Sequence, residues 1–224
     1  MQNGYHDRLL HKRAAEYERI YQKPERQPDL LLVADYLKNE LSGRHALEVA
    51  CGTGYWTEIA ANAATRIVAT DINEEVLTIA RAKRLSPEVV TFENRDAYRP
   101  DIQGKFDAGF ACFWWSHVPL ERLHQFLMDF HASLEPGSSV TFVDNRFVPG
   151  SSTAISESDD DGNTYQSRRL LDGTTHRLLK NFPSPVFLRD TLGAYSDDVL
   201  VTEFEYFWCV TYALNKTTGG KKPA

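Results

Sequence analysis

The sequence predicts one α/β domain built around a mostly parallel sheet. Three observations lead to this prediction. Between residues 44 and 144, short apolar runs alternate with segments of helical periodicity, which is the pattern of β–α–β units. A glycine-bearing turn at residues 50–54 follows the first of these apolar runs. The chain has 224 residues, of which 42% are hydrophobic, and it is therefore long enough to bury one sizeable core.

The residues before this core are predicted to be helical. Leu9–Tyr21 and Asp29–Leu41 both carry apolar side chains at helical spacing. Pro24 and Pro28 lie in the charged segment between them and should separate the two helices. We therefore expect residues 1–43 to form a helical cap.

Within the core, strands and helices are expected to alternate. Asn73 is a candidate N-cap for one helix, and Pro136-Gly137 should end another. The expected strands are His45–Val49, Arg66–Thr70, Val89–Glu93, Phe106–Cys112 and Ser139–Asp144, and the expected helices are Trp56–Asn62, Asn73–Arg84 and Leu120–Leu134.

After the core the pattern changes. Residues 149–163 are rich in Ser, Asp and Gly and are predicted to form a loop. Asp172-Gly173 separates two strand-like runs, Gln166–Leu171 and Thr174–Leu179, and so predicts a hairpin. We interpret residues 145–185 as a lid inserted after the fifth strand.

The last part of the chain returns to regular structure. Pro185–Tyr195 is a predicted helix, and the β-rich segment Val199–Leu214 is either one bent strand or a terminal hairpin. Residues 216–224 are polar and glycine-containing and are expected to be a flexible tail. Residues 1–215 should thus form a single domain.

Composition narrows the possible partners and surroundings. The net charge is −6 and the basic residues are scattered, so no nucleic-acid partner is expected. The three cysteines form no CxxC pair, no apolar run is long enough to span a membrane, and residues 1–20 do not resemble a signal peptide, which together favour the cytoplasm. The acidic run Glu157–Asp161 lies in a serine-rich stretch and is interpreted as solvated, so no metal is expected.

The turn after the first strand points to a ligand site. Gly52 and Gly54 allow the backbone to turn tightly and to approach a ligand. A dinucleotide motif would carry a third glycine, but Thr57 stands in its place. The pattern therefore argues against a nicotinamide dinucleotide.

Acidic residues lie at or shortly after the ends of the first three predicted strands. Glu48 lies at the end of the first strand, where a carboxylate suits an amino group or a cationic centre rather than a pyrophosphate. Asp71 can accept hydrogen bonds from ribose hydroxyls, and Asp96 from an adenine amino group. These acids favour an adenosyl ligand that is cationic and lacks phosphate.

The segment LEVACGTGYWTEIA…ATDINEEVLTIARAK…FENRDA…FDAGFACFWWSHV…LEPGSSVTFVD resembles the class I S-adenosylmethionine-dependent methyltransferases of small molecules. This resemblance implies a Rossmann-like, doubly wound, mostly parallel seven-stranded sheet with helices on both faces. It implies S-adenosylmethionine (SAM) as cofactor and methyl transfer to a small-molecule acceptor, at oxygen or nitrogen. The cofactor-binding residues that it implies are Glu48, Ala50, Gly52, Gly54, Trp56, Asp71, Ile72, Asp96, Ala97, Phe113 and Tyr21.

The acceptor is expected near the residues that follow the fourth strand. His117 could take a proton from the acceptor, but it could instead only pack or bind backbone. In the insertion, polar and basic side chains would suit a polar or carboxylated acceptor, although a solvated hairpin would look the same. The candidate acceptor-binding residues are Trp114, Trp115, Tyr5, Tyr165, Arg168 and Arg169.

Two other functions stay open at this point. One is a protein or nucleic-acid methyltransferase on the same scaffold, although no DPPY-like tetrapeptide follows the fourth strand. The other is a protein that binds SAM without turnover. The sequence makes no prediction about the oligomeric state.

Overall fold

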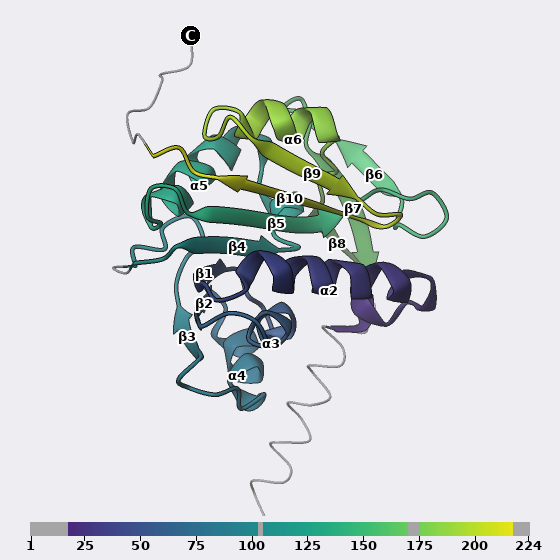
Figure 1. Ribbon diagram of the computed structural model, residues 1–224. Helices are drawn as coiled ribbons and strands as arrows, with labels where there is room; N and C mark the ends of the chain where they lie inside the picture. The colour runs from purple at the N-terminus through teal and green to yellow at the C-terminus, as the bar shows by residue number, and fades with distance from the viewer. Residues whose placement is uncertain (1–17, 103–104, 170–174, 217–224) are drawn as a thin grey trace, which may run out of the picture.

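The computed structural model describes residues 18–102, 105–169 and 175–216. Its centre is a seven-stranded sheet in the order β3-β2-β1-β4-β5-β10-β9 (Figure 1). Neighbouring strands are parallel, except that β10 runs antiparallel to both β5 and β9. The strands are β1 (His45–Val49), β2 (Arg66–Asp71), β3 (Val90–Asn94), β4 (Ala108–Cys112), β5 (Ser139–Asn145), β9 (Val199–Glu203) and β10 (Phe207–Ala213).

Helices cover both faces of this sheet. Buried side chains of α2, α3 and α4 pack on one face, and those of α5 and α6 pack on the other. The helices are α2 (Gln27–Leu41), α3 (Tyr55–Ala60), α4 (Glu74–Ala82), α5 (Leu120–Ala132) and α6 (Pro185–Leu192), with the 3₁₀ helices η1 (Glu18–Gln22), η2 (Pro24–Arg26) and η3 (Trp115–His117). The predicted fold class, a doubly wound α/β sheet with helices on both faces, is confirmed.

The start of α4 shows how local sequence sets an element. The side chain of Asn73 accepts a 2.9 Å hydrogen bond from the backbone N–H of Glu75, as the N-cap prediction requires. Leu77 and Ala80 then point into the core and are completely buried. The helix therefore begins directly after β2 and packs back onto the sheet.

The N-terminal cap differs from the prediction. Residues 18–22 form the 3₁₀ helix η1 instead of the end of an α-helix over Leu9–Tyr21, and residues 9–17 lie outside the described part of the chain. Lys23 is extended, with φ −64° and ψ 122°, because the residue before a proline is disfavoured in the α region. The helical conformation therefore stops at Lys23 and resumes in η2 and α2.

The C-terminal segment is a terminal hairpin and not one bent strand. Residues 204–206 connect β9 to β10, and the backbone N–H of Phe204 donates a 2.8 Å hydrogen bond to the carbonyl of Phe207. A three-residue connection is therefore sufficient. Residues 217–224 of the predicted tail lie outside the described residues.

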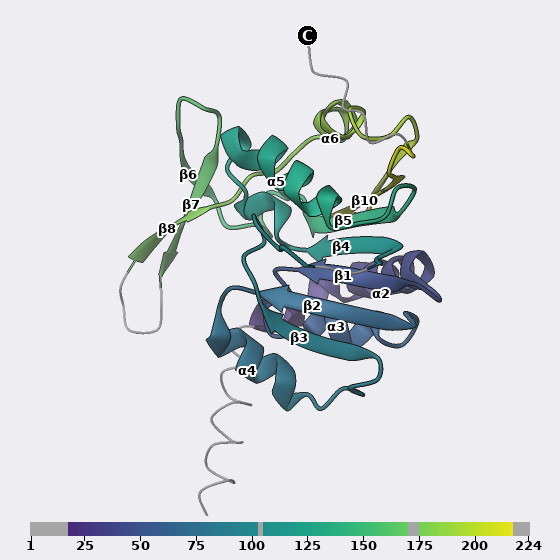
Figure 2. The ribbon, with the colours of Figure 1, turned by 90° about the vertical axis from the view of Figure 1, so that its left-hand side faces the viewer.

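The insertion after β5 is a separate three-stranded sheet that stands beside the main one (Figure 2). Its strands are β6 (Ile155–Ser158), β7 (Thr164–Arg169) and β8 (Thr175–Leu179). The predicted hairpin corresponds to β7 and β8, which pair antiparallel, while its turn at Asp172-Gly173 lies outside the described residues. The prediction of a continuous loop over residues 149–163 is wrong at β6. All four residues of β6 are exposed, so no alternation of apolar and polar side chains marks the strand.

Candidate active site

The turn after β1 passes through three left-handed residues. Ala50, Gly52 and Gly54 have φ values of 53°, 57° and 74°. Packing also favours glycine at position 54, because a Cβ there would lie 3.1 Å from the Cβ of Ala80, closer than an ordinary van der Waals contact. A Cβ on Gly52 would meet nothing within 4 Å, so this side of the turn faces open space where a ligand can approach the backbone.

Glu48 presents a buried acid beside this turn, with only 1% of its surface exposed. Its Oε2 accepts a 2.6 Å hydrogen bond from the hydroxyl of Thr57, while its Oε1 is buried and has no partner among the described residues. Burial raises the pKa of Glu48 to about 8; the Thr57 hydrogen bond opposes the rise, and the charge of Asp71 adds to it. A cationic group at Oε1 would remove the cost of the unsatisfied oxygen.

Asp71, the last residue of β2, is oriented by two backbone N–H groups. Gly52 donates to its Oδ2 at 2.9 Å, and Asn73 donates to its Oδ1 at 2.8 Å. A carboxylate oxygen has two lone pairs, so both oxygens can still accept a hydrogen bond from a pair of hydroxyls. The geometry is thus compatible with the predicted ribose contact.

The other predicted adenine-side residues lie on neighbouring segments. Ile72 follows Asp71 and is 65% exposed, which leaves a large apolar surface at this edge. Asp96 comes after β3, and its Oδ1 accepts a 2.9 Å hydrogen bond from the backbone N–H of Tyr98. Ala97, the residue between Asp96 and Tyr98, is buried. Because β2 and β3 are adjacent and parallel, these residues meet at one edge of the sheet.

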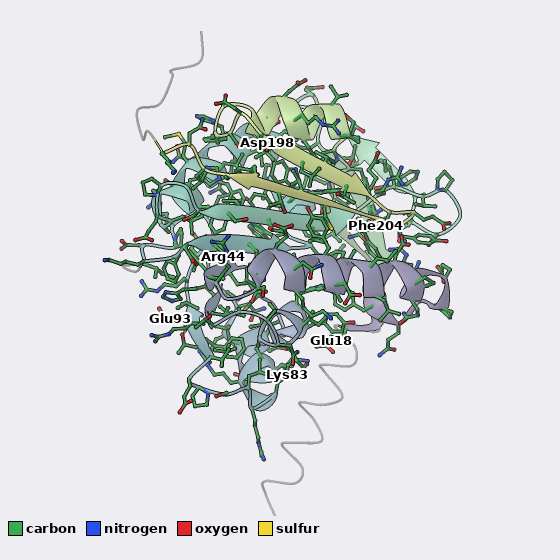
Figure 3. All side chains as sticks on the ribbon, in the orientation of Figure 1. Glu18, Arg44, Lys83, Glu93, Asp198 and Phe204 are labelled. Atoms are coloured by element: carbon green, nitrogen blue, oxygen red, sulfur yellow. The ribbon has the colours of Figure 1, made fainter. Side chains whose placement is uncertain are left out.

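The N-terminal segment is bonded directly to the glycine turn. Oε1 of Glu18 accepts a 2.8 Å hydrogen bond from Oγ1 of Thr53 and lies 3.1 Å from Nζ of Lys83. Figure 3 labels Glu18, in η1, close to Lys83, the residue directly after α4. These contacts fix η1 next to the turn that the ligand would use.

Aromatic rings from three segments gather beside this turn. Tyr21 stacks on Tyr55, with ring centroids 4.2 Å apart, and meets Trp56 and Phe113 edge-on at 5.7 and 5.4 Å. Phe113, the residue after β4, has a φ of 61°. Tyr21, Trp56 and Phe113, which the sequence analysis assigned to the cofactor, are therefore neighbours in the structure.

The two tryptophans after Phe113 have different surroundings. Trp114 is partly buried, its ring lies 5.8 Å from that of Tyr98, and its Nε1 has no partner among the described residues. Trp115 is only 2% exposed and packs in the core against Phe142, at 5.2 Å between ring centroids. We therefore do not retain Trp115 among the acceptor-binding residues.

His117 bonds to the insertion. Its Nδ1 donates a 2.9 Å hydrogen bond to the carbonyl of Leu179, the last residue of β8. In a neutral imidazole this bond places the proton on Nδ1 and the lone pair on Nε2. The contact therefore holds the ring in the tautomer that a proton acceptor at Nε2 would need.

A buried polar cluster at the end of β5 was not predicted. Asp144 is fully buried; its Oδ2 accepts a 2.9 Å hydrogen bond from the backbone N–H of Ser116, and its Oδ1 lies 3.2 Å from Nζ of Lys180. Lys180 also donates a 2.6 Å hydrogen bond to the Ser116 hydroxyl. Burial opposes ionisation, but Lys180, His117 and the hydrogen bonds outweigh it and hold the pKa of Asp144 below its usual range. Asp144 is the next-to-last residue of β5, as Glu48 is of β1, and an acid near the end of a predicted strand was the available sequence signal.

The base of the insertion is firmly attached. Asn163 and Asn181 are 1% and 5% exposed. Oδ1 of Asn163 accepts from the backbone N–H of Leu120 at 2.8 Å and from Nδ2 of Asn181 at 3.0 Å. Asn181 also donates to the carbonyl of Val118 at 3.2 Å. The insertion is therefore tied to the start of α5.

The remaining predicted acceptor residues are spread over the insertion. The Tyr165 hydroxyl donates a 2.7 Å hydrogen bond to Asp159, and its ring faces the Arg177 guanidinium at 3.4 Å, so its contacts lie within the insertion. Arg168 and Arg169 lie at the end of β7 farthest from this base. Tyr5 lies outside the described residues.

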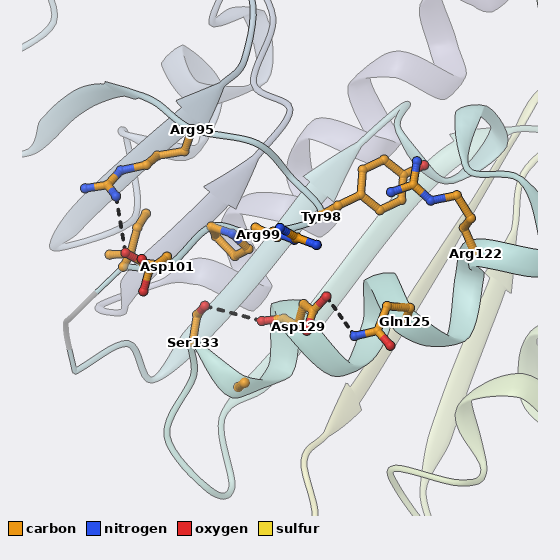
Figure 4. Close-up of a pocket in the computed structure, with 11 residues that line it drawn as sticks. Arg95, Tyr98, Arg99, Asp101, Arg122, Gln125, Asp129 and Ser133 are labelled. Atoms are coloured by element: carbon orange, nitrogen blue, oxygen red, sulfur yellow. Dashed lines mark hydrogen bonds between the residues drawn. The ribbon is translucent and has the colours of Figure 1, made fainter.

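A separate hollow lies between α5 and the loop after β3 (Figure 4). Its volume is about 750 Å³, and none of the predicted site residues lines it. The Arg122 guanidinium stacks 3.6 Å from the centre of the Tyr98 ring at its border. Arg122 therefore covers one face of the Tyr98 ring.

Two further observations concern the whole described region. Its helices include none that is long and apolar enough to cross a membrane. Across residues 18–102, 105–169 and 175–216, no three His, Cys, Asp or Glu side chains are grouped so that they could hold a metal ion.

Comparison with known proteins bears on this geometry. Residues 46–137 match the family described as "Methyltransferase domain". The solved DhpI–SAH complex has a TM-score of 0.72 and 27% identity and covers 94% of this chain and 96% of that one. The DhpI–SAM–HEP complex has a TM-score of 0.70 and 27% identity and covers 92% of this chain and 96% of that one. A third solved structure is SAM-bound CalS10, an amino pentose methyltransferase from Micromonospora echinaspora involved in calicheamicin biosynthesis. It has a TM-score of 0.58 and 16% identity and covers 89% of this chain and 96% of that one. No curated protein matches the sequence.

The sheet order, the glycine turn and the acids at the carboxyl ends of β1, β2 and β3 define an α/β protein of the adenosyl-cofactor-binding class. The family match and the structural neighbours make the assignment specific. The chain belongs to the class I SAM-dependent methyltransferase superfamily.

Proposed function

We propose that this protein transfers a methyl group from SAM to a small-molecule acceptor, at an oxygen or nitrogen atom. The observation that carries the proposal is the unpartnered Oε1 of Glu48, buried beside the open side of Gly52. A buried acid with one free oxygen suits the ammonium group of an amino acid moiety and would repel a phosphate. SAM carries such an ammonium group, and NAD does not.

The site residues divide between the parts of the cofactor. Glu48 would bind the amino end, Asp71 the ribose hydroxyls, and Ile72 the adenine face. When bound, the cofactor supplies a sulfonium methyl group that is already activated for transfer. The protein's contribution is then to position the acceptor and to keep water away from it.

The rings of Tyr21, Trp56 and Phe113 are suited to that task. Their mutual contacts leave little room for water, and an aromatic face attracts a cation such as a sulfonium. Burial of its hydroxyl raises the pKa of Tyr21 above the ordinary value, which keeps this residue neutral beside the cofactor.

On the acceptor side we place His117, Ser116 and Lys180, which lie beyond β4 and β5. Residues 145–185 and the N-terminal cap would act together as a lid over a single methyltransferase domain spanning residues 1–215. A small-molecule acceptor is favoured by the net charge of −6, which disfavours nucleic acid, and by the likeness to CalS10.

Calorimetry tests the cofactor assignment. We expect SAM and S-adenosylhomocysteine (SAH) to bind and NAD not to bind. Asp71→Ala should weaken SAH binding by about 1–3 kcal/mol, since buried hydrogen-bonding groups lose their partner. Asp35→Ala, in an exposed ion pair on α2, is the matched control. NAD binding without SAH binding would refute the proposal. Incubating the protein and labelled SAM with a metabolite extract or an RNA pool then separates small-molecule turnover from the alternatives.

A further inference from the structure

Arg26, in η2, is a buried cation without a carboxylate partner. It is 7% exposed, and none of the ion pairs formed among the described residues includes it. Its Nε and Nη2 donate to the hydroxyl of Ser151 at 3.2 and 3.0 Å, and its Nη1 donates to Oδ1 of Asn145 at 3.2 Å. All of these acceptors are neutral.

Glu25 compensates this charge only indirectly. The Ser151 hydroxyl donates a 3.0 Å hydrogen bond to Glu25, and Glu25 is exposed, so water screens its charge. A guanidinium has five N–H donors, and those three bonds leave two without a partner in the described part of the chain. Removing a cation from water is unfavourable unless an anion is paired with it. Among the described residues, Asp29 and Asp144 each reach Arg26 only through a neighbour, Tyr206 or Asn145, so no carboxylate is directly paired with the guanidinium.

The location of Arg26 indicates which ligand could bring that anion. Asn145 is the last residue of β5, and the guanidinium also lies 5.3 and 5.8 Å from the rings of Tyr206 and Phe207. Phe207 in turn contacts Phe113, with 5.5 Å between ring centroids. Arg26 thus lies at the carboxyl end of β5, near the rings of Tyr21, Trp56 and Phe113.

The cofactor's amino acid end is assigned elsewhere on this edge. Glu48 belongs to β1, and β4 lies between β1 and β5 in the sheet. Arg26 is therefore displaced from the cofactor's amino acid end toward the acceptor side, where Lys180 and His117 also lie. Lys180 is already paired with Asp144, so it does not supply an equally free charge.

We propose that Arg26 binds an anionic group of the methyl acceptor, a carboxylate or a phosphate-type oxyanion. This inference rests on the proposed function. A planar guanidinium matches the oxygens of such groups with two parallel N–H donors, which a lysine cannot do. The acceptor would accordingly be a small acid, and a neutral analogue would be a poor substrate.

Calorimetry on the protein saturated with SAH tests this, with inorganic phosphate and acetate as probes at fixed ionic strength. We expect one of the two anions to bind the wild type. Arg26→Gln should weaken that binding by roughly tenfold or more, and Arg26→Lys by at least about threefold. The control is Arg44→Gln, because Arg44 is paired with Asp107 at the opposite edge of the sheet (Figure 3). It should bind as the wild type does.

Several results would overturn the inference. One is an SAH-saturated wild type that binds neither anion. Another is equal anion affinity in the wild type and in Arg26→Gln or, if that variant does not fold, in Arg26→Lys. A third is weaker SAH binding in the Arg26 variants, which would assign the charge to the cofactor's own carboxylate. Failure of the wild type to bind SAH at all would instead defeat the proposed function, so the two failures are distinguishable.

Discussion

Thr57 donates a 2.6 Å hydrogen bond to Oε2 of Glu48, and both side chains are buried. The hydroxyl occupies one carboxylate oxygen and leaves the other unpartnered. Thr57 stands where a dinucleotide motif would have its third glycine. The residue that argued against NAD in the sequence therefore has a positive role in the structure, because it orients the acid that would bind the cofactor.

The first prediction concerns Glu48 and pH. Its pKa in the folded protein is about 8, against an ordinary value of 4.5, so over this interval the folded protein holds a proton that the unfolded chain has released. The contribution of Glu48 to stability is therefore complete below pH 4.5 and is lost as the pH rises through about 8. Without cofactor, the free energy of unfolding should fall more steeply from pH 5 to 8 in the wild type than in Glu48→Gln.

Urea unfolding at a series of pH values measures this difference. Glu48→Gln should also weaken SAH binding by about 1–3 kcal/mol, because a neutral amide replaces the charged partner. Parallel stability profiles for the two proteins would contradict the raised pKa, whatever the effect on SAH.

The second prediction concerns His117. If its Nε2 accepts the acceptor's proton, His117→Gln should lower kcat by about 10²–10⁴-fold with little change in SAH affinity. If the ring serves only to hold the carbonyl of Leu179, the loss should be small and independent of pH. Initial rates with labelled SAM between about pH 5 and pH 9 decide between these outcomes, and His124→Gln, an exposed histidine on α5, is the control.

The third prediction concerns the lid. Binding of SAH should slow hydrogen exchange in the cap, at residues 18–26, and in the insertion, at residues 155–169 and 175–179, because ordered lids protect their own amides. Protection confined to the strand ends near residues 48–54, 71 and 96 would show that both segments are ordinary surface structure.

The anchoring of the insertion sharpens this experiment. Asn181→Ala removes the buried amide that donates a hydrogen bond to Asn163, and it should destabilise the folded insertion by about 1–3 kcal/mol. Exchange in β6, β7 and β8 should then accelerate without cofactor, while the central strands β1 and β4 keep their protection. Asn62→Ala, which removes an exposed hydrogen bond at the end of α3, should change neither region.

The fourth prediction concerns acid stability. Nε2 of His131 lies 2.6 Å from the Tyr212 hydroxyl, and Nδ1 has no partner among the described residues. Burial lowers the pKa of His131 from 6.5 to about 3, so between these values the unfolded chain takes up a proton that the folded protein does not. Stability from this residue should therefore be lost as the pH falls below 6.5, by up to about 1.4 kcal/mol per pH unit.

His131→Gln should flatten this loss, as measured by urea unfolding from about pH 7 to pH 4. Asn62→Ala, which removes an exposed hydrogen bond and no titratable group, should retain the wild-type slope. Equal slopes in wild type and His131→Gln would show that the imidazole is protonated in the folded protein without penalty.

The sequence was sufficient for the features that depend on short-range pattern. Hydrophobic periodicity located β1, β2 and β3, and a parallel sheet brings their carboxyl ends to one edge, so Glu48, Asp71 and Asp96 could be grouped before any coordinates. The N-cap at Asn73 is equally local.

What escaped prediction depends on long-range contacts. Asp144 and Lys180 are 36 residues apart, and only the path of the insertion brings them together. After β4, the 3₁₀ turn η3 places Trp115 in the core and leaves Trp114 only partly buried. The sequence analysis did not predict this turn. The burial of Arg26 could not be predicted either, because the residues that surround it, such as Asn145 and Tyr206, are more than 100 residues away in the sequence.

Ala50 and Phe113, the residues directly after β1 and β4, both have left-handed backbones although neither is glycine. That conformation costs about 1–2 kcal/mol for a residue with a Cβ. Such strain collects where backbone geometry serves a ligand more than the resting protein. This limits how the protein can be stabilised against heat. Glycine at position 50 or 113 would remove the backbone strain but would make the cofactor-binding edge more flexible, and that edge must have its shape before the cofactor binds. Stabilising substitutions should therefore be sought in α5 and α6, on the other face of the sheet.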